Sequence, residues 1–159
     1  MTGLSILNAQ EQKMELASQA LKSFQGVSEF AVIVDHSDLP DCLKTARPSI
    51  EAEVQKQLSA SPKLRHTIVT PSSTKAPFSS LWISTRIKCG AASICAAAVS
   101  VSFQQSVQSL VHERAQFPVP TWMREELLVE PEPEILSKTR ETLSGLLSLF
   151  VSDFLRANP

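Results

Sequence analysis

The clearest pattern in the chain is an alternation of apolar and polar or small residues on both sides of Gly90. The odd-numbered positions of residues 81–89 and 95–103 carry nearly all of the large apolar side chains. A period of two is typical of strands that bury one face, and a turn centred on Ala92 brings both odd-numbered sets onto one face. We therefore predict a β-hairpin, with a long Ala-rich helix through residues 96–98 as the alternative. The predicted cross-strand pairs are Cys89/Cys95, Ile87/Ala97, Thr85/Val99, Ile83/Val101 and Leu81/Phe103.

The other elements are predicted from the spacing of apolar residues and from prolines. The run Phe30–Val34 is apolar and mostly β-branched, which predicts an interior strand covered on both faces. Pro118 and Pro120 are expected to break regular structure, and the proline-spaced acidic residues at 130–134 are expected to form a solvated linker. The predicted elements, in order, are a helix at 8–25, the strand at 30–34, a helix at 48–60, a short strand at 65–70, the hairpin, with its second strand reaching about residue 112, and a long amphipathic helix after the linker.

These elements predict an α+β fold. The expected sheet is mostly antiparallel and four- or five-stranded, with an early β-α-β unit, and helices pack on it, the long C-terminal helix across one face. Residues 1–26 are expected to form an N-terminal helix appended to a single α+β domain at 27–159. The second face of such a sheet needs cover from the N-terminal helix or from a second copy, so we expect a homodimer.

Composition and charge exclude several classes of protein. The 159 residues are 43% hydrophobic, which is too apolar for a mostly disordered chain and enough for one sizeable core. The formal net charge of -1 leaves no basic excess, so we expect no nucleic-acid partner. Residues 89–112 contain no charged residue apart from the terminal histidine, but their serines and glutamines are too costly in hydrocarbon for membrane insertion.

The N-terminal region carries no recognisable export signal. Charged residues interrupt the first 25 positions, which therefore lack the apolar segment of a secretory leader. We expect a cytoplasmic protein as the sequence is written, and a periplasmic one if a leader was removed.

Candidate chemistry is sparse. The three cysteines lack metal-ligand spacing, and the chain has neither a Walker loop nor a Gly-x-Gly-x-x-Gly motif, so we expect no metal and no cofactor. Cys89 and Cys95 are opposed in the predicted hairpin, either as two small buried thiols or as a disulfide. No pattern pairs a nucleophile with a base, and we assign no catalytic residue.

The even-numbered side of the predicted hairpin is the best candidate for a binding surface. Trp82 and Arg86 lie there among serines and alanines, and both residue types are enriched in interface hot spots. The alternative is that the N-terminal helix packs on this side. The leading hypothesis is a non-catalytic binding or assembly module that acts as a homodimer, with a protein or small molecule as a further partner. The second is a small-molecule-binding protein or small enzyme, with a pocket between sheet and helices to which His66, Arg86 or His112 contributes polar groups.

Three short segments add a resemblance. They are Phe103-Gln104-Gln105-x-Val107, Pro120-Thr121-Trp122 and the terminal Asp153-Phe154-Leu155-x-Ala157-Asn158-Pro159. With these segments, residues 27–159 resemble a group of small, mostly exported bacterial proteins of unknown function. The resemblance implies a third hypothesis, an envelope-associated structural protein.

Overall fold

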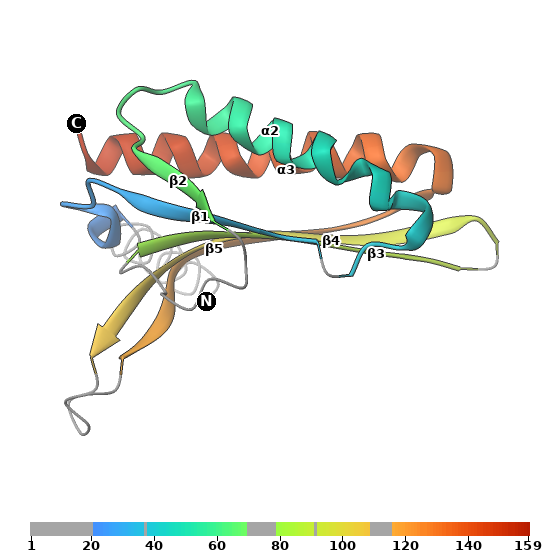
Figure 1. The fold of residues 1–159 in the computed structure, drawn as a ribbon, viewed down its shortest axis with the longest axis horizontal. Coiled ribbons are helices and arrows are strands. Elements are labelled where there is room, and N and C mark those ends of the chain that lie inside the picture. Colours follow the sequence, from blue (N-terminus) through green and yellow to red (C-terminus); the bar gives the residue numbers. More distant parts are fainter. Residues whose placement is uncertain (1–20, 37, 70–78, 91, 109–115) are drawn as a thin grey trace, which may run out of the picture.

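The computed structural model describes residues 21–36, 38–69, 79–90, 92–108 and 116–159. Within them, five strands form one sheet in the order β2-β1-β3-β4-β5, and helices α2 and α3 lie together on one of its faces (Figure 1). The α+β class is therefore confirmed. The elements are β1 (Phe30–Asp35), the 3-10 helix η1 (Asp41–Ala46), α2 (Arg47–Ser59), β2 (His66–Val69), β3 (Ser79–Cys89), β4 (Ile94–Gln108), β5 (Gln116–Pro131) and α3 (Glu132–Ala157).

The sheet is mixed, so the expectation of a mostly antiparallel sheet is wrong. β1 runs parallel to both β2 and β3, whereas the β3–β4 and β4–β5 pairs are antiparallel. The early β-α-β unit is confirmed by the parallel pairing of β1 with β2 across α2. An apolar run such as Phe30–Val34 indicates burial on both faces, which suits a strand between parallel neighbours, but it does not specify the direction of those neighbours.

The predicted hairpin and its register are confirmed. β3 and β4 pair antiparallel, and all five predicted pairs, from Cys89/Cys95 to Leu81/Phe103, are present. The alternative of a continuous helix is wrong, because residues 94–108 form strand β4. The register places the odd-numbered residues of β3 and β4 on the face beneath the helices. β4 continues to Gln108, and the rest of its predicted extension lies outside the described residues.

β5 overturns the prediction of irregular structure after Pro118 and of a linker at 130–134. The strand runs from Gln116 to Pro131 through both Pro118 and Pro120, and α3 begins at Glu132 without a linker. Proline lacks the N–H of a ladder hydrogen bond, but the outer strand of a sheet has one side without a partner strand. β5 lies at that outer position, so its prolines are tolerated.

The β4–β5 pair also contains an irregularity. Its register shifts between Phe103 and Gln104, where Trp122 and then Pro120 are the partners on β5. Bulges bend the strands that contain them, and beyond this point the pair curves away from the rest of the sheet (Figure 1).

An aromatic cluster forms one end of the core. The rings of Phe24 and Phe103 lie 5.1 Å apart, and Phe150 lies within 6 Å of both. Most of the predicted N-terminal helix lies outside the described residues, but residues 21–24 are helical and Gly26, with φ of 75°, follows them. Asn158 ties this segment to the end of α3, since its side chain donates to the carbonyl of Phe24 at 2.9 Å and accepts from the Gly26 N–H at 3.2 Å.

α2 packs by a narrow apolar stripe. Ile50, Val54 and Leu58 are fully buried. Glu53 is also buried, and it accepts a hydrogen bond from Gln57 at 2.9 Å, which lowers the pKa of the carboxyl group. Gln57 also donates to Ser144 of α3 at 2.7 Å, so this polar contact joins the two helices.

Candidate interaction surface

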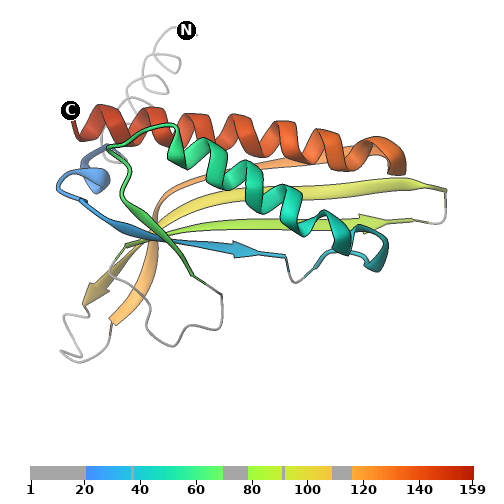
Figure 2. The same ribbon diagram turned by 45° about the horizontal axis from the view of Figure 1, so that its top comes forward.

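The open face is the side of β3, β4 and β5 that points away from α2 and α3 (Figure 2). The paired registers place the even-numbered residues of β3 and β4 and the odd-numbered residues 123–129 of β5 on it. Most of these side chains are small or polar on β3 and β4, whereas three of the four on β5 are apolar. Between Trp82 and the hairpin turn, the open face consists of Trp82, Ser84, Arg86, Lys88, Ile94, Ala96, Ala98, Ser100, Ser102, Met123, Glu125, Leu127 and Val129.

β5 exposes apolar side chains on the face that a half-covered strand normally leaves polar. Met123, Leu127 and Val129 on the open face are 53%, 79% and 70% exposed. Arg124 and Glu126 point to the helix side, yet both are exposed because β5 lies at the edge of the sheet. Leu127 and Val129 are neighbours on this face, and Met123 lies beyond Glu125. Clustered exposed apolar side chains make this part of β5 a candidate contact site, whereas isolated ones are ordinary.

Trp82 and Arg86 share the open face, as the hairpin register predicted. Trp82 is half-buried and pairs with Ser102 across the ladder, while Arg86 pairs with Ala98 and is 65% exposed along its side chain. The guanidinium Nε of Arg86 lies 3.6 Å from Oδ2 of Asp38, an exposed ion pair of small energetic value.

The two histidines of the second hypothesis do not join this surface. His66 lies at the start of β2 opposite Phe30, on the helix side, where its ring stacks on Phe30 at 6.2 Å and Nδ1 lies 3.0 Å from the Leu64 carbonyl. His112 lies outside the described residues. His66 and Arg86 are therefore on opposite faces of the sheet and do not converge on one pocket.

A disulfide joins Cys89 and Cys95 near the turn of the hairpin. The sequence left this pair open between two thiols and a bridge. Cys95 is buried and Cys89 is exposed, so the bridge lies where the core meets solvent.

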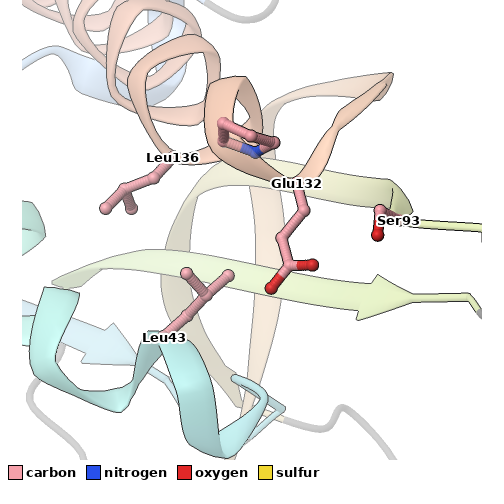
Figure 3. Close-up of a pocket in the computed structure, with 5 residues that line it drawn as sticks. Leu43, Ser93, Glu132 and Leu136 are labelled. Atoms are coloured by element: carbon pink, nitrogen blue, oxygen red, sulfur yellow. The ribbon is translucent and has the colours of Figure 1, made fainter.

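A cavity of about 430 Å³ lies beside the hairpin turn (Figure 3). Its polar groups are the Ser93 hydroxyl and the Glu132 carboxylate, and the Glu132 backbone N–H donates to the Ser93 carbonyl at 2.8 Å. None of the candidate binding residues predicted from the sequence lines it, although Glu132 and Pro133 belong to the acidic segment predicted to be a linker. The lining residues are Leu43, Ser93, Glu132, Pro133 and Leu136.

His36 is a buried titratable group that lies apart from the open face. It follows β1, and its Nε2 lies 3.5 Å from Oε1 of Glu51 on α2. Burial lowers the pKa of His36, and the negative charge of Glu51 partly opposes that effect. No sequence spacing connects residues 36 and 51, so only the fold reveals this pair.

Sequence reasoning missed the β5 row altogether. The signal that could have revealed it is the stretch between Pro120 and Pro131, ten residues that contain Trp, Thr, Leu and Val and no proline or glycine. In the described part of the chain, no three His, Cys, Asp or Glu side chains gather as a metal site would require. Across the same ranges, no helix combines the length and apolarity of a membrane span.

Comparisons with known proteins add little. No protein-family model and no curated protein matches the chain. Among solved structures, it is similar to a PelC dodecamer from Paraburkholderia phytofirmans, with 16% identity and a TM-score of 0.43, over 75% of this chain and 85% of that chain. This similarity is too low to indicate a function or an assembly.

Proposed function

We propose that the protein is a non-catalytic assembly module that acts as a homodimer through β5. The observation that carries this proposal is the row of exposed apolar side chains, Met123, Leu127 and Val129, on the solvent side of a strand. Burying such a row against another surface removes apolar area from water, at roughly 25 cal/mol per Å².

A second copy of the chain is the partner that the charges favour. With a formal net charge of -1, two copies do not repel each other strongly. The open face also carries both signs, Glu125 on β5 and Arg86 and Lys88 on β3, so it offers partners for its own charges. An isologous interface needs this kind of self-complementary patch.

The disulfide supports a location outside the reducing cytoplasm. Disulfides persist in oxidising compartments such as the periplasm and are rare in the cytosol. From the Cys89–Cys95 bridge we infer that the protein is periplasmic.

Sedimentation velocity over a range of protein concentrations tests the homodimer. Leu127→Lys places a charge in the apolar row and should raise the dimer dissociation constant at least about tenfold. Leu149→Lys is the matched control, because Leu149 is 52% exposed on α3, which covers the other face. A wild-type protein that stays monomeric at every concentration, or a dimer equally insensitive to both substitutions, would overturn the proposal.

A further inference from the structure

Within the described residues, β5 has a backbone edge without a partner strand, in addition to its apolar row. It is the outer strand of the sheet, next to β4. The Glu132 N–H bonds to the Ser93 carbonyl in line with the β4–β5 register, so the even-numbered residues from Trp122 to Glu130 are the ones that exchange hydrogen bonds with β4. The N–H and C=O groups of Met123, Glu125 and Leu127 consequently point outward, away from β4. These groups form a template on which another strand can pair.

Prolines confine this template to one segment. Pro118 and Pro120 remove donors on one side and Pro131 removes a donor on the other, which leaves residues 121–130 able to pair. The opposite edge of the sheet, β2, is only four residues long. Short strands and prolines are ordinary devices that prevent edge pairing, and residues 121–130 of β5 have neither, although four of these ten residues are charged.

We propose that β5 of one copy pairs antiparallel with β5 of a second copy, in the register that places Glu125 on the two-fold axis, to give a continuous ten-stranded sheet. This inference rests on the proposed homodimer and specifies its geometry. A two-fold axis perpendicular to the sheet keeps the open faces of both copies on the same side.

The side chains favour the Glu125 register over its neighbours. It places Arg124 opposite Glu126 of the partner subunit and Met123 opposite Leu127 of the partner subunit, and the two-fold axis makes each pair twice. Opposite charges and apolar side chains in directly facing positions stabilise antiparallel strands. Centring on Glu126 would oppose that residue to itself and place Glu125 against an apolar residue. Centring on Arg124 would oppose two guanidinium groups.

The backbone fits the same register. Met123, Glu125 and Leu127 all have outward-pointing groups, so the pairs they form are hydrogen-bonded pairs, while Arg124 and Glu126 form the closer, non-hydrogen-bonded pairs. The one unfavourable feature is the exposed Glu125 opposite its own copy. The joined sheet would bring two open faces together as one larger surface, with apolar residues on both sides of the seam.

A charge swap distinguishes edge pairing from any dimer formed through the open face. Arg124 and Glu126 lie on the helix side of β5, so a dimer that stacks open face on open face does not sense them. Arg124→Glu and Glu126→Arg should each weaken the dimer by about tenfold, because each puts like charges opposite one another twice. The double variant restores opposite charges in this symmetric register and should recover most of the affinity, as measured by sedimentation velocity.

Glu125→Thr gives a change in the opposite direction. Removing the like charges at the axis and adding a β-branched residue should tighten the dimer several-fold. Glu141→Thr is the control for loss of a surface carboxylate, since Glu141 is exposed on α3. Hydrogen exchange provides a readout that needs no variant. The amides of Met123, Glu125 and Leu127 should exchange more slowly as the protein concentration, and with it the fraction of dimer, increases.

The outcomes separate the two proposals. A protein that is monomeric at all concentrations overturns the homodimer itself. Edge pairing alone is overturned by three results together. The dimer dissociation constant does not change in the Arg124 and Glu126 variants, the double variant shows no rescue, and the amides of Met123, Glu125 and Leu127 exchange as in the monomer.

Discussion

On the face of the sheet beneath α2 and α3, Leu81, Val99 and Phe103 are fully buried, whereas on the open face Leu127 and Val129 are 79% and 70% exposed. The two sets occupy the same sheet but point to opposite faces, and the exposed set lies on the edge strand β5. On the helix side, the apolar residues are buried within the chain, so their burial contributes to the stability of the fold. On the open face, the described fold leaves the same kind of residue exposed to water, where it contributes little to the stability of the fold.

β5 shows the contrast within one strand. Trp122 points to the helix side, is buried and donates through Nε1 to Asp153 of α3 at 3.1 Å. The next residue, Met123, points to the open face and is 53% exposed. A substitution at the first kind of position should change the free energy of unfolding, and one at the second should change association.

Phe103→Ala and Leu127→Ala test this separation most strongly. Phe103 is fully buried in the aromatic cluster, so its truncation should lower the free energy of unfolding by about 3–5 kcal/mol. Leu127→Ala should change the unfolding free energy by less than about 0.5 kcal/mol when measured by urea denaturation at a protein concentration below the dimer dissociation constant. Similar losses in both variants would show that Leu127 is covered within the monomer and would break the comparison.

The disulfide, at the hairpin end of the helix-side face, gives a smaller effect. Cys89 and Cys95 are only six positions apart, so replacing both by alanine should lower the unfolding free energy by about 2 kcal/mol at most. Reduction of the wild type should lower the unfolding free energy by the same amount. Urea denaturation with and without a reductant measures this change. Cys42→Ala is the control and should keep the full sensitivity to reductant. Titration of the unreduced, denatured wild type should find one free thiol among its three cysteines.

The hairpin could be predicted to the residue because its information is local. Alternation on both sides of Gly90 allowed only one register that buries the odd-numbered side chains together, and β3 and β4 adopt it. The same register correctly placed Trp82 and Arg86 on the open face. Their role in binding stays a prediction.

The rest of the sheet depends on information that local patterns lack. β5 was missed because Pro118 and Pro120 are incompatible with a central strand, and whether a strand lies at an edge is decided by the other strands. The parallel direction of β3 relative to β1 was missed for a similar reason: it follows from the path of the chain between distant segments. The β5 row could not be identified without that strand, and the separation of His66 from Arg86 likewise follows from the order of strands.

Acidification should distinguish the two sides of the sheet by the smallest of these effects. His36 is held on the side packed against α2, and burial lowers its pKa, so the unfolded chain binds more protons than the folded one once the pH falls below about 6.5. The contribution of the neutral His36 side chain to the unfolding free energy is present in full above that pH. It is lost as the pH falls toward the lowered pKa, because protons then bind preferentially to the unfolded chain. In His36→Gln, which cannot take up the proton, the decrease in unfolding free energy between about pH 7.5 and pH 5 should be shallower than in the wild type.

The acid effect of Glu53 lies at lower pH because its pKa is lowered from the ordinary carboxyl range, so it does not interfere. The dimer dissociation constant should differ little between wild type and His36→Gln over the same range, because His36 lies away from β5. Equal pH slopes of stability in the two proteins would show that the His36 imidazole is hydrated in the folded chain.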